Sequence, residues 1–175
     1  MRRTRSLTLC ALFAALTVVC AQIQIPIQPV AMSMALLAVH LTAALLTPAQ
    51  AAAVTGVYLL MGALGLPVFT GFRGGFAVLM DRTGGYIAGY VLCAWLTGTM
   101  IRRAGRSWGC MTLAMAAGTL ACYALGTVWF MLLTSVPLWT ALTLCVIPFI
   151  PGDAAKILLA AALARRLERP LKRIT

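Results

Sequence analysis

The sequence predicts an all-α integral membrane protein with six transmembrane helices and both termini in the cytoplasm. Residues of the AVILMFWYC set make up 62% of the 175 residues, and charged residues only 10%, against roughly 25% in average soluble chains. The mean hydropathy is +0.98. The net charge of +11 comes from basic residues clustered between apolar runs. This arrangement is typical of a protein that crosses the lipid bilayer several times, and it argues against nucleic-acid binding.

Six apolar segments approach the length of about 20 residues that a membrane-spanning helix needs. The second and third meet at Thr47-Pro48 and are expected to form a tight hairpin, because proline fits the first turn of a helix. The stretch 134–150 is also apolar, but its prolines favour a loop with a short helix. In one polytopic domain over residues 1–175, the predicted spans are 6–25, 32–47, 49–66, 84–101, 108–133 and 151–167.

The basic residues predict the orientation of these spans. With six spans, eleven of the 14 basic residues fall on one side of the membrane, and the positive-inside rule makes that side cytoplasmic. A seventh span would send the C-terminal cluster outside. The first span follows three arginines, as in a signal peptide, but we expect it to be retained because the chain stays hydrophobic afterwards. The clusters are Arg2, Arg3 and Arg5; Arg102, Arg103 and Arg106; and Arg165, Arg166, Arg169, Lys172 and Arg173.

Asp153 and Lys156 are the unusual charges, because they lie at the start of the last span. Positions i and i+3 project from the same face of a helix, and a charge at membrane depth is costly unless it is paired or hydrated. One interpretation is structural: Asp153 caps the helix and Lys156 pairs with it. The other is a polar floor for a ligand, in which the carboxylate accepts N–H donors and the ammonium binds an anion.

The connection between the third and fourth spans is rich in glycine and lies on the external side of the predicted topology. Gly71, Gly74 and Gly75 allow close backbone approach, and long loops of this kind often cover binding sites. Thr83-Gly84-Gly85 then begins the fourth span, whose exposed N–H groups can bind an anion. We expect a lid over a site near Asp153, with a plain flexible connector as the alternative.

Several motifs in order along the chain resemble the BioY family, the biotin-specific substrate-binding (S) subunits of energy-coupling-factor (ECF) transporters. Two segments depart from the family pattern, at Asp81-Arg82 and at Ala31 to Ala35. The motifs are Ala21-Gln22-Ile23-x-Ile25-Pro26, Gly65-Leu66-Pro67-Val68-Phe69, Thr83-Gly84-Gly85-Tyr86, Tyr123-x-x-Gly126-x-x-Trp129 and Pro148-Phe149-x-x-Gly152-Asp153-x-x-Lys156.

This resemblance implies six helices, a biotin site near the external face, and import through a transmembrane coupling subunit and two ABC-type ATPases in a prokaryotic cytoplasmic membrane. Asp153 would bind the ureido N–H groups of biotin, and Lys156 or Arg82 its carboxylate. Ala11 and Ala15 on the first span would contact the coupling subunit, with packing inside the chain as the alternative. The other candidate binding residues are Thr83, Gly84, Gly85, Tyr86, Trp129 and Phe149.

Other functional classes find less support in the residues. An intramembrane hydrolase needs a nucleophile with a base, or metal ligands, but the chain has one histidine and three acidic residues. A channel or exporter needs polar groups at several depths, whereas here they gather near one end of the spans. There is no phosphate-binding loop for ATP, and the six cysteines form no C-x-x-C pair. We therefore expect no catalytic residue, metal or cofactor; an S subunit for another vitamin remains the main alternative.

Overall fold

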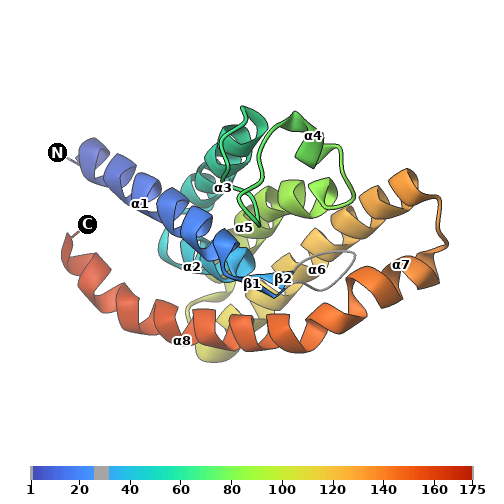
Figure 1. Ribbon diagram of the computed structural model, residues 1–175. Helices are drawn as coiled ribbons and strands as arrows, with labels where there is room; N and C mark the ends of the chain where they lie inside the picture. Colours follow the sequence, from blue (N-terminus) through green and yellow to red (C-terminus); the bar gives the residue numbers. More distant parts are fainter. Residues whose placement is uncertain (1, 26–31, 175) are drawn as a thin grey trace.

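The computed structural model describes the backbone of residues 2–25 and 32–174 and the side chains of residues 4–25 and 32–168. This part of the chain is helical apart from a short hairpin and the connecting loops (Figure 1). In the hairpin, β1 (Gln24–Ile25) pairs antiparallel with β2 (Met32–Ser33). The helices are α1 (Arg2–Gln22), α2 (Ala35–Leu45), α3 (Pro48–Ala63), α4 (Phe76–Leu79), α5 (Gly84–Ala104), α6 (Trp108–Thr134), α7 (Leu138–Cys145) and α8 (Ile150–Ile174), with a 3₁₀ turn, η1 (Ile147–Phe149), before α8.

The expected hairpin at Thr47-Pro48 is present, and local chemistry explains its boundaries. The Thr47 hydroxyl accepts the backbone N–H of Gln50 at 3.3 Å, and the Gln50 side chain accepts the backbone N–H of Thr47 at 3.0 Å. This capping box begins α3, with Pro48 in its first turn. The helix ends at Ala63, short of the expected 66, where Gly65 adopts a φ of +100° that interrupts helical geometry.

Two of the expected spans are short helices in the structure. α2 has 11 residues, or about 16 Å at 1.5 Å per residue, and begins at Ala35 because residues 32–33 form β2. α3 has 16 residues, or about 24 Å, against a hydrocarbon core of about 30 Å. Among the described residues, four segments are long and apolar enough to cross a membrane: Thr4–Gln22, Gly84–Ala104, Trp108–Thr134 and Leu138–Glu168. The segment Leu138–Glu168 joins α7 and η1 to the first part of α8. α7 and η1 lie in the stretch 134–150, where the sequence predicted a loop with a short helix.

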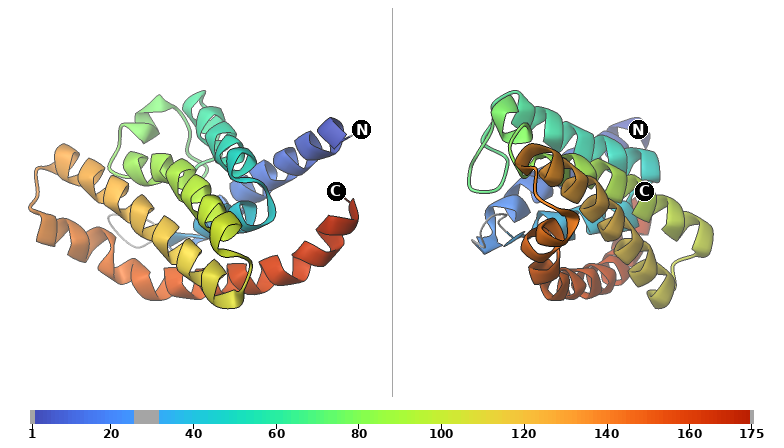
Figure 2. Two further views of the ribbon diagram at one scale, coloured as in Figure 1. Left: turned by 180° about the vertical axis from the view of Figure 1, so that it is seen from behind. Right: turned by 90° about the vertical axis from the view of Figure 1, so that its right-hand side faces the viewer.

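α2 forms the centre of the molecule. All ten residues from Ala35 to Ala44 are buried, because α1, α3, α5 and α8 all contact this helix. α8 runs as one long helix past α2 and α6, and both termini lie at the same end of the molecule (Figures 1 and 2). α2 is therefore enclosed by other helices along nearly its whole length.

Close packing of α5 against α6 sets the position of Tyr86. A Cβ added at Gly126 would overlap the Tyr86 ring, and a Cβ added at Gly85 would overlap the Trp129 side chain. The two glycines thus allow an aromatic ring of each helix to lie directly on the backbone of the other. This seam holds Tyr86 at the inner side of α5, where it faces the end of α7 and the start of α8.

Candidate functional site

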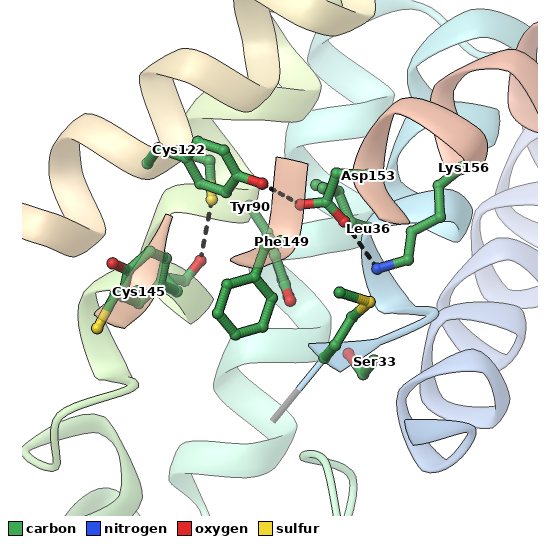
Figure 3. Close-up of a pocket in the computed structure, with 11 residues that line it drawn as sticks. Ser33, Leu36, Tyr90, Cys122, Cys145, Phe149, Asp153 and Lys156 are labelled. Atoms are coloured by element: carbon green, nitrogen blue, oxygen red, sulfur yellow. Dashed lines mark hydrogen bonds and ion pairs between the residues drawn. The ribbon is translucent and has the colours of Figure 1, made fainter. Parts of the chain in front are cut away.

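A cavity of about 60 Å³ lies where the start of α8 meets β2, α2, α5 and α6 (Figure 3). Its walls combine aromatic and sulfur-containing side chains with a small group of polar ones. Phe149, on the turn before α8, is buried and forms part of the apolar wall. The lining residues are Met32, Ser33, Leu36, Tyr86, Tyr90, Cys122, Tyr123, Cys145, Phe149, Asp153 and Lys156.

The Asp153 carboxylate is the polar centre of this cavity. Its Oδ1 accepts the Lys156 ammonium at 2.7 Å, and its Oδ2 accepts the Tyr123 hydroxyl. The side chains of Asp153 and Lys156 are only 8% and 7% exposed. A buried charge is tolerated when it is paired and hydrogen-bonded, and a carboxylate in the first turn of a helix also gains from the helix dipole. Because a carboxylate has about four acceptor positions, Asp153 still has capacity for two ligand N–H groups.

A second cavity of about 40 Å³ adjoins the first, because both are lined by Ser33, Tyr86 and Tyr90. Beyond these shared residues, the second cavity has polar groups of its own. Arg73 enters its wall from the α3–α4 loop, with its guanidinium 3.7 Å from the Asp81 carboxylate. Thr83 lines the same cavity, and its buried hydroxyl oxygen has no hydrogen-bond partner within the described structure. The two cavities together offer a carboxylate at one end and a guanidinium with a hydroxyl at the other.

The structure brings together four of the predicted binding residues in the first cavity: Tyr86, Phe149, Asp153 and Lys156. Thr83 lines the second cavity. The Tyr86 hydroxyl lies 3.3 Å from the Thr127 hydroxyl, so the ring is held at both its face and its tip.

Gly84, Gly85 and Trp129 are placed elsewhere, in a separate apolar hollow of about 250 Å³ between α3, α4, α5 and α6. The Trp129 indole N–H donates to the Asp81 carbonyl at 3.1 Å, which turns the ring toward the α4–α5 loop and away from Asp153. Arg82 is exposed, lines none of these three cavities, and donates its backbone N–H to the Asp81 carboxylate at 2.7 Å.

The predicted lid glycines all lie in the connection from α3 to α4. Gly71 and Gly75 have φ values of +76° and +98°, and a Cβ at Gly74 would overlap the Leu66 carbonyl. The turn they shape carries Phe69, Thr70 and Arg73 in the wall of the second cavity. Pro26 and Ala31, from the family-like motif and the departing segment, lie outside the described residues.

Ala11 and Ala15 are exposed on α1. They form one stripe with Leu7 and Val19, which are 69% and 60% exposed, because residues four apart share a helix face. All four residues of this stripe are exposed, so the stripe is open to lipid or to another subunit.

Five cavity residues with a hydroxyl or guanidinium group were not predicted as ligand contacts: Ser33, Thr70, Arg73, Tyr90 and Tyr123. Tyr123 belongs to a motif that resembles the BioY family, but it was not predicted from the sequence to contact the ligand. Arg73 was one of the three basic residues outside the cytoplasmic clusters. Ser33 lies in the segment Ala31 to Ala35 that departs from the family pattern. Tyr90 carries no comparable signal, since a single tyrosine in an apolar segment most often serves packing.

The site contains no arrangement typical of hydrolytic or metal chemistry. Among the described residues, no group of three or more His, Cys, Asp and Glu side chains lies close enough to hold a metal ion. His40 is fully buried in α2, with its Nε2 3.0 Å from the Thr119 hydroxyl. What the geometry can do is bind a small molecule with N–H donors at one end and an anionic group at the other.

Comparison with known proteins agrees with this chemistry. The model of the BioY family matches residues 1–173. A protein named biotin transporter BioY from Thermotoga maritima is 36% identical over 94% of this chain and 96% of its own length. A probable biotin transporter BioY from Pyrococcus horikoshii is 36% identical over 95% of this chain and 98% of its own length. Among solved structures, the S-component for biotin from an ECF-type ABC transporter matches 96% of this chain and 93% of that one, with 26% identity and a TM-score of 0.90. With sequence and fold both matched over nearly the whole length, the chain belongs to the BioY family.

Proposed function

We propose that this chain is the membrane substrate-binding subunit for biotin uptake, and not an enzyme. The observation that carries the proposal is the buried Asp153 carboxylate, held by Tyr123 and Lys156 in a cavity whose other walls are largely apolar. Biotin has the matching chemistry: two ureido N–H donors, an apolar sulfur ring and a carboxylate tail. The names of the Thermotoga and Pyrococcus relatives support the same ligand. Biotin is then cargo, and the subunit has no resident cofactor.

The two adjoining cavities suggest how biotin lies. The ureido ring donates to Asp153, its carbonyl accepts from Lys156, and the sulfur ring packs against Phe149 and Tyr86. The tail passes Ser33 and Tyr90 into the second cavity, where its carboxylate meets the Arg73 guanidinium and the Thr83 hydroxyl. This pose uses Arg73 in preference to Arg82, which lines neither cavity, and in preference to Lys156, whose ammonium is already paired with Asp153 at 2.7 Å.

For the whole chain we propose six membrane helices in the cell membrane, with both termini in the cytoplasm. Clustering of eleven of the 14 basic residues supports this topology. So does the ion pair between Arg106 and Glu168 at 3.1 Å, which brings the α5–α6 loop to the C-terminal part of α8. The short helices α2 and α3 cross as a hairpin, in which α2 is buried and α3 keeps one exposed face.

Uptake against a gradient needs partners, because the sequence has no phosphate-binding loop of its own. An ECF coupling subunit and two ABC-type ATPases fill this role, and the ECF context of the matching S-component supports it. The exposed stripe with Ala11 and Ala15 suits a close helix–helix contact with the coupling subunit, since small residues let backbones approach.

Equilibrium binding of labelled biotin to the purified chain tests the proposal. Asp153→Asn should weaken binding by about 30- to 1,000-fold, because an amide loses a charged hydrogen bond and turns a donor toward a donor, at a cost of about 2–4 kcal/mol. Glu168→Gln, which removes the acidic charge that pairs with Arg106 about four helical turns further along α8, is the matched control and should bind biotin normally. Unchanged affinity and melting temperature in Asp153→Asn would refute the site, and stronger competition by another vitamin would refute biotin as the substrate.

A further inference from the structure

Gln22, the last residue of α1, uses both atoms of its side-chain amide to hold one distant loop, and its Nε2 also donates to the Val18 carbonyl of its own helix at 3.4 Å. Its Nε2 donates to the carbonyls of Val68 at 3.2 Å and Phe69 at 3.3 Å, and its Oε1 accepts the Phe72 backbone N–H at 2.9 Å. These partners are separated from Gln22 by 46 to 50 residues of chain. A single side chain thus joins the end of α1 to the connection between α3 and α4.

The loop that Gln22 holds is a tight turn, residues 68–73, which we call the 68–73 loop. Phe69 and Arg73 close it by exchanging backbone hydrogen bonds of 2.9 and 3.3 Å. At its tip Gly71 and Phe72 have φ values of +76° and +56°. For a non-glycine residue this conformation is strained, and the Phe72 side chain is 72% exposed, so packing does little to stabilise it. The bond to Gln22 is what satisfies the Phe72 N–H in this conformation.

The base and the tip of the 68–73 loop are held in different ways. Phe69 is 1% exposed and packs edge-on against Tyr58 with ring centroids 5.5 Å apart, which fixes one end to α3. The tip has no comparable apolar anchor, and its Phe72 N–H is bonded to Gln22. Loss of the Gln22 contacts would free the tip, including Thr70 in the wall of the second cavity, while Arg73 would still be held by its backbone bonds to Phe69 and its ion pair with Asp81.

We propose that Gln22 is a positioning residue that latches the 68–73 loop over the second cavity and so sets how often that cavity opens to ligand. The proposal rests on the proposed function, because the cavity is the one assigned to the biotin carboxylate. It gives the lid a defined closing contact, and it places that contact on α1, the helix that also carries the exposed stripe with Ala11 and Ala15.

The decisive variant is Gln22→Met, which keeps the length of the side chain and removes the amide. The matched control is Val19→Met, which places the same side chain one turn earlier on α1 at an exposed position. With labelled biotin, Gln22→Met should speed both association and dissociation by about tenfold and change the equilibrium constant much less, as expected when opening is easier but the closed site is intact. Val19→Met should leave both rates unchanged.

A second measurement keeps the latch separable from the ligand. Amide hydrogen exchange in the 68–73 loop of the ligand-free protein should be about tenfold faster in Gln22→Met than in wild type or Val19→Met. Unchanged exchange would overturn the latch, whatever happens to biotin binding. Faster exchange with unchanged biotin rates would overturn the gating role. If the wild-type protein binds no biotin, the proposed function is overturned, and the exchange measurement alone then tests whether Gln22 holds the loop.

Discussion

At the scale of single residues, Thr83 has the environment that most needs an explanation. Its hydroxyl is buried and has no hydrogen-bond partner within the described structure, and such a group carries an unrecovered desolvation cost. A carboxylate in the second cavity would satisfy it. Removal of the Thr83 hydroxyl should therefore stabilise the ligand-free protein and weaken ligand binding.

Thr83→Val removes the hydroxyl and keeps the shape of the side chain. We expect an equal or higher melting temperature without ligand, because an unsatisfied buried group is lost, together with roughly tenfold weaker biotin binding, because a hydrogen bond to a charged group is lost. Thermal unfolding and equilibrium binding on the same preparation check both signs. A fall in the melting temperature would mean that the hydroxyl already has a structural partner.

Arg73→Gln should separate the two ends of the ligand. Loss of the guanidinium should weaken biotin by about 10- to 100-fold and the neutral biotin amide by less than about threefold, since the amide lacks the charge that Arg73 binds. Lys156→Met should weaken both ligands alike, because it acts on the shared ureido end. If Lys156→Met instead discriminates between acid and amide, the carboxylate lies beside Lys156 and the pose is reversed.

The residue-level prediction from sequence succeeded in placing Asp153 and Lys156 side by side because i and i+3 spacing acts within one helix. Tyr123 could not be assigned by the same reasoning, since its contact with Asp153 spans 30 residues and depends on how α6 meets α8. Trp129 shows the converse difficulty. It lies six residues after Tyr123, which at about 100° per residue places it roughly 240° around α6, toward the α4–α5 loop, where the Asp81 carbonyl accepts its N–H.

At the scale of helices, the α5–α6 seam determines where Tyr86 lies. Gly126→Ala would place a methyl group inside the Tyr86 ring, so the ring or the whole helix must move. We expect a lower melting temperature, by the equivalent of about 1–3 kcal/mol for overpacking, and weaker biotin binding. Gly56→Ala in α3 is the control: nothing lies within 4 Å of its added Cβ, so it should be neutral or stabilise by up to about 1 kcal/mol. Equal effects of the two substitutions on binding would show that the seam does not position the site.

At the scale of the molecule, topology can be tested with cysteines. In a variant that lacks the six native cysteines, single cysteines at positions 72 and 104 report on opposite ends, since Phe72 and Ala104 are both exposed. A reagent that does not cross membranes should label position 72 and not position 104 in intact cells. The reverse pattern would invert the protein and place the proposed site on the cytoplasmic side.

Apolar composition and basic clusters were sufficient to predict a helical membrane protein, because both reflect the bilayer directly. They could not predict the true lengths of the second and third segments. A segment buried in protein is as apolar as a segment that faces lipid, so hydropathy does not distinguish the two. α2 is apolar because other helices of the protein surround it. The strand at 32–33 depends on pairing with β1, which no pattern within the segment 32–47 reveals.

The burial of α2 has a consequence for biogenesis. A helix of 11 residues, buried along ten of them, has no lipid-facing surface and is too short to be a stable span alone. It must enter the bilayer with α3 and wait there for neighbours that are synthesised later. One of these is α8, the last helix, which packs against α2. The nascent protein therefore lacks a complete interior until α8 has been inserted, and a chain truncated before α8 would leave one side of α2 without its protein partner.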